Sequence, residues 1–356
     1  MNIVIDSNIV LLKESLELDY KVITFDGGEL TPKLLQETNS EVLFVRSTTN
    51  CDVFLLGDSN VRFVGTATAG IDNLDLEYFE KNNIKWTNAA GSNSISVAEF
   101  TTLAIKTWCE KNQKDISKLT LGIVGFGNIG SKVGKIFEKH CKHLLVTDPY
   151  IEHINSINAT LCSIEELLSD SDIITFHTPL VSEGEHPTYK LLDLNKMDLI
   201  KKDALIINVA RGGVVDEQAI KIANHNPNNL IFDVWENEPY IDSEFAASLF
   251  ISTPHIAGHS FEGKLRGTLN MLQSLELYLG KSIDKSLILT EINKYEKYRL
   301  SSLEYIDLCN KLENNIQLVA TSNQFKEILN SFDYKKFNKI RKEYPKHNET
   351  LSYDSF

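Results

Sequence analysis

Long apolar runs, paired cysteines and an excess of basic residues are all missing from this 356-residue sequence. No apolar run approaches the roughly 18 residues that a membrane-spanning helix requires. The five cysteines are scattered without a CxxC pair, which argues against disulfides or a zinc site and favours reduced thiols in a cytoplasm. The first residues, MNIVIDSN, lack a basic segment and indicate a strand rather than a signal peptide. We therefore expect a cytoplasmic protein without a metal site and without a membrane partner.

Acidic residues outnumber basic ones, 49 to 36, so that the formal net charge is −13. This balance disfavours a nucleic-acid partner, because phosphate neutralisation needs clustered Lys and Arg. A small anionic ligand needs only a few local cations and remains compatible with the charge. The apolar fraction of 42% and the charged fraction of 24% are those of a globular protein, and the length suggests two or three domains.

Short apolar segments alternate with helical segments up to about residue 255. The apolar segments include 2–5, 42–45, 62–66, 119–124, 144–147, 173–176, 205–209 and 230–234. Several are continuously apolar, as expected for strands that are buried on both faces of a parallel sheet. The alternation therefore predicts a doubly wound α/β architecture. The segment 95–112 is long enough for a helix between two α/β units, and we place a domain boundary there.

Two Ser-x-x-Glu patterns have the spacing of a capping box and predict helix starts, at Ser96 with Glu99 and at Ser163 with Glu166. Beyond about residue 290 the sequence becomes rich in Lys, Asn, Glu and Tyr, with few apolar runs. Its aromatic residues favour an ordered small domain over residues 291–356, because disordered tails are usually poor in aromatics.

A glycine turn, GFGNIG at 125–130, lies between the apolar segment 119–124 and an amphipathic stretch. In this context the glycines permit a tight turn, close approach of a pyrophosphate and close packing of helix on strand. The free N–H groups of the new helix would then face the phosphates. The next strand ends at Asp148, whose carboxylate can accept ribose hydroxyls and would repel a 2′-phosphate, so NAD is favoured over NADP. The expected dinucleotide contacts in this region are Gly125, Gly127, Asn128, Ile129, Gly130 and Asp148.

Three later segments each place polar residues after a predicted strand, where open α/β sheets bind their ligands. They are NVARGG at 208–213, DVWENEP at 233–239 and PHIAG at 254–258. Arg211 is suited to hold a carboxylate with its guanidinium fork. His255 could carry a hydroxyl proton, and either Glu236 or Glu238 could orient its imidazole.

Together these motifs resemble the D-isomer-specific 2-hydroxyacid dehydrogenases over roughly residues 1–285. The resemblance rests on LGIVGFGNIG, TFHTPL, INVARGGVVDEQAI, FDVWENEP and PHIAG. It implies that Arg211 binds the substrate carboxylate, that Glu238 rather than Glu236 is the catalytic glutamate, and that His255 is the acid/base. It also implies NAD contacts from Thr178, Val209, Ala210, Asp233 and Gly258.

The same resemblance implies a fold of two doubly wound parallel-sheet domains and a small C-terminal α+β dimerisation domain. The expected Rossmann NAD-binding domain covers 93–256. A flavodoxin-like substrate or lid domain covers 1–92 and is completed by 257–290, and the dimerisation domain covers 291–356. We therefore expect a homodimer.

A narrower resemblance points to the branch of this family that oxidises 4-phospho-D-erythronate in pyridoxal phosphate biosynthesis. It rests on VRSTT at 45–49, GTATAGIDNLD at 65–75, GSNSISVAEF at 91–100, HIAGHSFEGKLRGT at 255–268 and the terminal FDYKKFNKIRKEYPKHNETLSY. The implied partner is a small phosphorylated 2-hydroxy acid, contacted by Ser47 and Thr68.

His259 stands where that branch usually has a tyrosine that contacts substrate, and its imidazole can still donate to a phosphate or hydroxyl. Arg46 adjoins Ser47 and is the candidate cation for the substrate phosphate. The terminal domain looks shorter than is usual in that branch. Alternative functions are oxidation of another 2-hydroxy acid, such as 3-phosphoglycerate, and an NADH-sensing corepressor role without catalysis.

Overall fold

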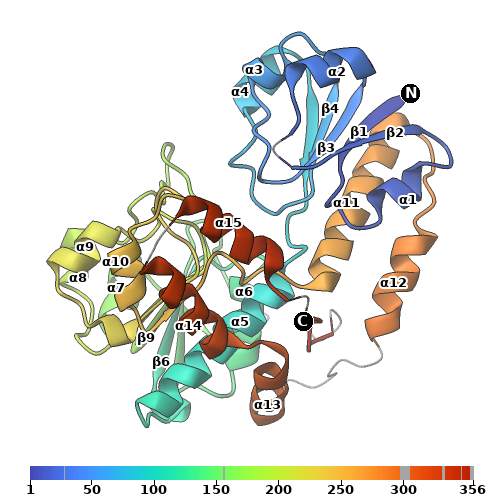
Figure 1. The fold of residues 1–356 in the computed structure, drawn as a ribbon. Coiled ribbons are helices and arrows are strands. Elements are labelled where there is room, and N and C mark those ends of the chain that lie inside the picture. The colour runs from blue at the N-terminus through green and yellow to red at the C-terminus, as the bar shows by residue number, and fades with distance from the viewer. Residues whose placement is uncertain (28, 155–156, 297–304, 331–332, 346, 353–356) are drawn as a thin grey trace. The chain divides into compact units, whose positions relative to one another are not determined.

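The computed structural model describes residues 1–27, 29–154, 157–296, 305–330, 333–345 and 347–352 (Figure 1). The chain divides into two units. The first unit is residues 1–93 with 260–299, and the second unit is residues 94–259 with 300–356. Among the described residues, no helix is both long enough and apolar enough to cross a membrane.

The first unit is built on a five-stranded parallel sheet with the strand order β2-β1-β3-β4-β5. Its strands are β1 (Asn2–Asp6), β2 (Lys21–Phe25), β3 (Val42–Val45), β4 (Phe63–Thr66) and β5 (Lys85–Asn88). Its helices are α1 (Leu12–Leu16), α2 (Pro32–Thr38), α3 (Val53–Leu56), α4 (Leu76–Lys81), α11 (Phe261–Leu279) and α12 (Ser286–Glu296). This strand order is the flavodoxin-like one, as the sequence predicts.

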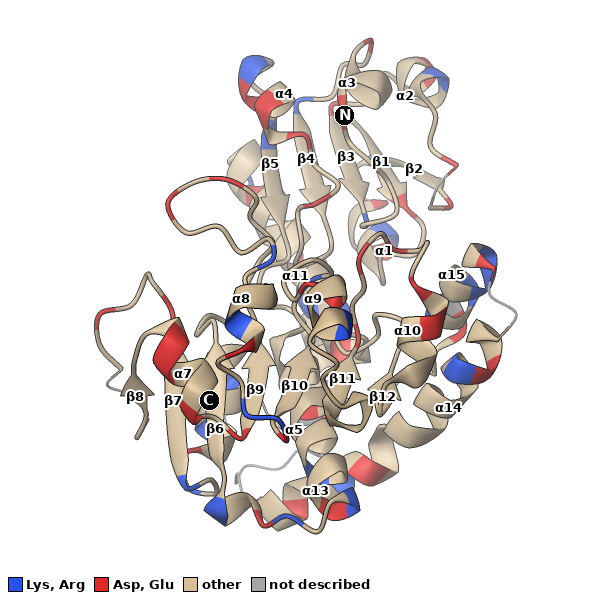
Figure 2. Ribbon diagram, turned by 90° about the vertical axis from the view of Figure 1, so that its left-hand side faces the viewer, with Lys and Arg blue, Asp and Glu red and all other residues tan. Residues whose placement is uncertain are grey.

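Alternate residues of the first sheet enter two different cores. Ile3 and Ile5 of β1 pack with α1 and α11, whereas Val4 between them packs with the core formed by α2, α3 and α4. Both faces are therefore covered, which explains the continuously apolar strands. In Figure 2 the central strands β3 and β4 are accordingly free of charged residues.

The second unit contains a seven-stranded parallel sheet with the order β12-β11-β10-β9-β6-β7-β8. Its strands are β6 (Thr120–Val124), β7 (His143–Thr147), β8 (Thr160–Leu161), β9 (Ile173–Phe176), β10 (Leu205–Asn208), β11 (Leu230–Phe232) and β12 (Ile251–Ser252). The order in which the chain adds strands reverses between β6 and β9. Strands β7 and β8 lie on one side of β6, and β9 to β12 lie on the other, as in the dinucleotide-binding fold. The predicted pair of parallel-sheet domains is confirmed.

Helices cover both faces of this second sheet. They are α5 (Ser94–Lys111), α6 (Gly130–Phe137), α7 (Ile164–Asp170), α8 (Leu194–Met197), α9 (Glu217–Ile222) and α10 (Ser243–Ser248). Trp108 of α5 and Phe137 of α6 are buried in the core on one face. Leu167 of α7 and Phe245 of α10 belong to the core on the other face.

The described residues beyond 300 are helical rather than mixed α+β, which corrects the expected character of this region. They form α13 (Tyr305–Asn315), α14 (Leu318–Leu329) and α15 (Tyr334–Glu343), and no strand longer than an isolated bridge is described there. The physical reason is helical spacing of the buried residues, such as Leu308 with Leu312 and Phe325 with Leu329. These helices pack on the second unit, where the ring of Phe325 lies 6.2 Å from that of Trp235.

The two predicted capping boxes have different outcomes. Ser163 and Glu166 form the reciprocal bonds at the start of α7, so this prediction is confirmed. The prediction for Ser96 and Glu99 is wrong, because α5 already begins at Ser94 and both residues are buried inside it. Their side chains instead bond to distant parts of the chain: Ser96 donates to Ala257, and Glu99 accepts from residues near the C-terminus.

Candidate active site

The glycine turn joins β6 to α6 at the point where the strand order reverses. A Cβ atom on Gly130 would lie 2.0 Å from the carbonyl oxygen of Gly125, so only glycine fits there. A Cβ atom on Gly127 would meet nothing within 4 Å. The turn is thus closed where the helix packs on the strand and open at Gly127, where a pyrophosphate could approach the backbone.

Asp148 follows β7 and is tied to the same turn. Its Oδ2 accepts the Phe126 N–H at 2.8 Å, and its Oδ1 accepts the Tyr150 N–H at 3.0 Å. Each carboxylate oxygen keeps a second lone pair that can accept a ribose hydroxyl. The acid is therefore held beside the turn before any ligand arrives.

Thr178 provides an independent test of whether a dinucleotide fits this site. Its methyl carbon lies 2.9 Å from the position that a Cβ of Gly125 would occupy, so it lines the turn. Its hydroxyl is buried and has no hydrogen-bond partner in the described structure. Because buried polar groups are normally satisfied, an unsatisfied hydroxyl beside an open glycine turn fits a bound NAD.

The loop after β10 carries Arg211. The Asn208 side chain shapes this loop, since its Oδ1 accepts the Ala210 N–H at 3.2 Å and its Nδ2 donates to the Arg211 carbonyl at 3.1 Å. The Arg211 Nη1 donates to the Ala210 carbonyl at 2.8 Å, and Val209 and Ala210 are buried. A Cβ on Gly212 would lie 1.8 Å from the Trp235 carbonyl oxygen, so the arginine loop packs directly on the glutamate loop.

Glu238 and His255 come from two neighbouring loops, after β11 and β12, and form a pair. Glu238 Oε2 lies 2.8 Å from His255 Nδ1, and Glu238 Oε1 accepts the Trp235 N–H at 2.9 Å. The structure thus brings Glu238 to the imidazole, whereas the backbone N–H of Glu236 donates to Glu217. With Nδ1 held by the carboxylate, Nε2 is the nitrogen that can exchange a proton with a substrate.

The electrostatic balance at Glu238 keeps it ionised. Burial acts to raise its pKa, but the charge and hydrogen bond of His255, together with the charge of Arg341, bring the pKa below its ordinary value. An ionised Glu238 fixes which ring nitrogen of His255 faces it. The pair is therefore suited to general acid–base work.

Asp233 organises the loop that carries His255. It is 1% exposed, and its Oδ1 accepts the Thr253 hydroxyl at 2.6 Å and the Ile256 N–H at 2.7 Å. Its Oδ2 accepts the Ala257 N–H at 2.9 Å. Its carboxylate therefore faces the loop, and its contact with the nicotinamide remains a prediction. Motif-based reasoning missed Thr253, although it directly precedes the PHIAG segment.

The far end of this loop contains Gly258 and His259. The Ala257 carbonyl accepts the Ser96 hydroxyl of α5 at 2.7 Å, and the His259 N–H donates to the Ile256 carbonyl at 2.8 Å. The His259 ring lies 6.2 Å from that of Tyr344, edge to face. No local signal in the sequence identified Ser96 or Tyr344 as neighbours of this loop, because both contacts join residues far apart in the chain.

The remaining predicted residues belong to the first unit. Arg46 and Ser47 follow β3, and Thr68 follows the adjacent strand β4, so all three lie at the carboxyl edge of that sheet. The Thr68 hydroxyl is 2.8 Å from the Thr66 hydroxyl, and the Arg46 carbonyl accepts the Asn73 amide at 3.3 Å. The structure thus places these residues on neighbouring loops of one sheet edge, and their contact with a substrate remains a prediction.

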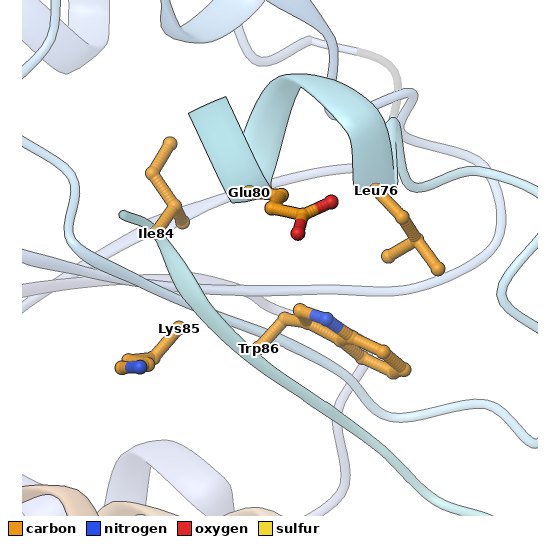
Figure 3. Close-up of a pocket in the computed structure, with 5 residues that line it drawn as sticks. All are labelled: Leu76, Glu80, Ile84, Lys85 and Trp86. Carbon is orange, nitrogen blue, oxygen red and sulfur yellow. The ribbon is translucent and has the colours of Figure 1, made fainter. Parts of the chain in front are cut away.

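A surface hollow elsewhere in the first unit contains none of the predicted site residues. It measures about 390 Å³ and lies between α4 and β5 (Figure 3). Its lining residues are Leu76, Glu80, Ile84, Lys85 and Trp86. Figure 3 shows the Glu80 carboxylate on the helix side and the Trp86 ring on the strand side.

Comparisons with known proteins identify the family of this chain. Residues 98–257 match the family model of the D-isomer specific 2-hydroxyacid dehydrogenase, NAD binding domain. Erythronate-4-phosphate dehydrogenase of Wigglesworthia glossinidia brevipalpis is 35% identical over 323 residues, covering 89% of this chain and 84% of the relative. The enzyme of the same name from Bacteroides thetaiotaomicron is 35% identical over 331 residues, covering 90% of this chain and 94% of the relative.

A solved structure shows the same fold. NAD⁺-bound 3-phosphoglycerate dehydrogenase of Entamoeba histolytica superposes with a TM-score of 0.66 and 25% identity, covering 78% of this chain and 95% of the other. The chain belongs to the D-isomer-specific 2-hydroxyacid dehydrogenases, and its second unit contains the NAD-binding domain of that family. Within the family, it is similar along most of its length to the erythronate-4-phosphate dehydrogenases.

The contrast between Gly127 and Gly130 gives a first prediction. Gly127→Ala should leave the melting temperature nearly unchanged, because its Cβ enters open space, but should weaken NADH binding roughly tenfold or more by obstructing the pyrophosphate. Gly130→Ala should lower the melting temperature, because its Cβ meets the Gly125 carbonyl. Thermal melts and NADH fluorescence titrations measure both effects. Unchanged NADH affinity in Gly127→Ala would contradict the proposed approach of the pyrophosphate to the backbone at Gly127.

Glu217 gives a prediction on pH. It is 5% exposed at the start of α9, accepts the Glu236 N–H at 2.7 Å, and burial raises its pKa from 4.5 to about 7. The folded state then binds its proton more tightly than the unfolded state. The resulting stabilisation is complete below about pH 4.5 and is lost as the pH rises through about 7.

Glu217→Gln keeps a side-chain oxygen that can accept the Glu236 N–H, but this side chain cannot ionise. Its free energy of unfolding relative to the unchanged protein should therefore rise between pH 5 and 8, by up to about 3 kcal/mol on the linkage relation. Urea unfolding across this pH range measures the difference. Glu244→Gln, on the surface helix α10, is the control. Parallel pH profiles for the unchanged protein and Glu217→Gln would show that Glu217 does not titrate as described.

Proposed function

We propose that this protein catalyses the NAD-dependent oxidation of 4-phospho-D-erythronate to (R)-3-hydroxy-2-oxo-4-phosphooxybutanoate, a step in pyridoxal 5′-phosphate biosynthesis. The observation that carries the chemistry is the 2.8 Å contact between Glu238 and His255 on a dinucleotide-binding unit. The similarity to relatives with this activity, over most of both chains, supports the substrate.

In the proposed mechanism, Arg211 binds the substrate carboxylate with its guanidinium fork and places the C2 hydroxyl near His255. Nε2 of His255 removes the hydroxyl proton as the carbonyl forms at C2. Glu238 stabilises the imidazolium that results, and its lowered pKa keeps it charged for this purpose. The glycine turn and Thr178 would hold NAD, and the chemistry that this cofactor would supply is acceptance of the hydride from C2.

The remaining roles follow the placement of the residues. Arg46, Ser47, Thr68 and His259 are proposed to bind substrate, with Arg46 as the cation for the phosphate. The proposed NAD contacts are Gly125, Gly127, Asn128, Ile129, Gly130, Asp148, Thr178, Val209, Ala210, Asp233 and Gly258. The open glycine turn and the unsatisfied Thr178 hydroxyl support this set.

We also propose the functional division expected from the sequence. Residues 1–92 with 257–290 would form the substrate or lid domain, 93–256 the NAD-binding domain and 291–356 a dimerisation domain of a homodimer. All five cysteines are free thiols, which supports a reducing, cytoplasmic location.

Steady-state oxidation assays test the substrate. With NAD as acceptor, kcat/KM for 4-phospho-D-erythronate should exceed that for D-3-phosphoglycerate or D-lactate by roughly tenfold or more, because a missing polar contact in a built site costs at least that much. Formation of NADH is followed by its absorbance. A preference for 3-phosphoglycerate would replace the proposed substrate, and NADH binding without turnover of any acid would favour the corepressor alternative.

The role of His255 is tested by His255→Ala. Loss of the general base should lower kcat by about 10²–10⁴-fold while the Kd for NADH stays within about twofold of normal. His143→Ala, at an exposed position on β7, is the matched control and should keep full activity. Retention of normal turnover by His255→Ala would rule out its role as the base.

A further inference from the structure

Thr350 and Leu351 are bound to α5 by a buried carboxylate. Glu99 is 0% exposed, and its Oε1 accepts the N–H groups of Thr350 and Leu351, both at 2.6 Å. Leu351 is itself buried in the core that contains α5. A buried carboxylate is stable only with strong donors, so these bonds fix residues 350 and 351 to the helix.

The same helix also holds the histidine loop. Ser96 lies three residues before Glu99, on the same side of α5, and its hydroxyl donates to the Ala257 carbonyl at 2.7 Å. One turn of α5 therefore binds two distant segments, the loop that carries His255 and the chain terminus. The same stretch of α5 therefore contacts residues 350 and 351 and the catalytic loop within the second unit.

Tyr344, directly after α15, makes a second contact with this loop. Its ring lies 6.2 Å from the His259 ring at 63°, an edge-to-face arrangement, and 5.8 Å from the His347 ring at 86°. Burial, and then the negative charge of Asp233, raise the pKa of the Tyr344 hydroxyl. Tyr344 therefore packs against the loop as a neutral ring.

The last turn of α15 carries Arg341, whose positive charge acts on the glutamate of the pair. The charge of Arg341 is one of the influences that favour ionised Glu238, after burial and the interaction with His255. The C-terminal region thus acts on both members of the pair: the charge of Arg341 acts on Glu238, and the ring of Tyr344 packs against the loop of His255.

We propose that Tyr344 and Glu99 are positioning residues for catalysis: Glu99 anchors the C-terminal residues, and Tyr344 holds the loop 255–259 in its working geometry. The proposal rests on the proposed function for the role of His255. It adds that the region after α15 contributes to turnover within its own chain, in addition to any role in assembly. Neither residue touches the reacting atoms, so their effect is exerted through the loop.

The test uses Tyr344→Ala and Tyr344→Phe in the full chain, with Tyr334→Ala at the exposed start of α15 as the control. Hydrogen exchange of the backbone amides at 253–259 reports the loop directly. Kinetics with 4-phospho-D-erythronate report kcat and KM, and NADH titration reports the integrity of the nucleotide site. Tyr344→Ala should increase exchange in this loop roughly tenfold and lower kcat by a similar factor, with unchanged NADH affinity.

Tyr344→Phe should behave like the unchanged protein, because the ring provides the contact. Exchange and kcat in Tyr344→Ala that match those of Tyr334→Ala would overturn the proposal. Failure of the unchanged protein to oxidise any acid would count against the proposed function alone, since the exchange measurement does not need turnover.

Glu99→Gln tests the anchor with little change in side-chain volume. Loss of the charge should weaken both bonds to the terminus and increase exchange at 253–259, whereas Glu110→Gln at the exposed end of α5 should not. If Glu99→Gln leaves loop exchange and kcat at the level of Glu110→Gln, Glu99 is not a positioning residue. If Tyr344→Ala fails to bind NADH, its nucleotide site is damaged and its kcat is uninformative. The comparison of Glu99→Gln with Glu110→Gln then decides the proposal.

Discussion

The buried carboxylate of Asp233 is the constraint on which the catalytic side of the second unit depends. A charge in the protein interior is costly unless donors surround it, and three donors from residues 253–257 do so here. The His255 N–H also donates to the Asp233 carbonyl at 2.7 Å. The loop therefore has a fixed backbone, and His255, in the left-handed region with φ of 58°, is directed to Glu238.

The carboxylates around this loop show how environment separates chemically identical groups. Glu238 contacts an imidazole and is also influenced by the positive charge of Arg341, so that its pKa falls despite burial. Glu217 meets one backbone N–H and nearby acids, so that burial dominates and its pKa rises to about 7. Opposite shifts in neighbouring groups are the usual basis for distinct roles. Here one carboxylate serves the imidazole, while the other binds the backbone of the glutamate loop.

Local patterns in the sequence predicted much of this structure. The glycine turn, the strands and the box at Ser163 depend on residues close in the chain, and the structure contains each of them. The contacts of Ser96 and Glu99 could not be predicted. Their Ser-x-x-Glu spacing is that of a helix cap, but here both side chains lie inside α5 and bond to Ala257 and Thr350. Which polar groups meet across long separations depends on packing that no local pattern specifies.

The open space at Gly127 also bears on how such a protein can change during evolution. Most substitutions that abolish function also destabilise the fold, and cells remove unstable chains. A Cβ atom at Gly127 would meet nothing within 4 Å apart from its chain neighbours, so alanine there could cost the chain its cofactor without disturbing its core. Such a variant would persist as an intact protein, free to acquire a role that does not require hydride transfer.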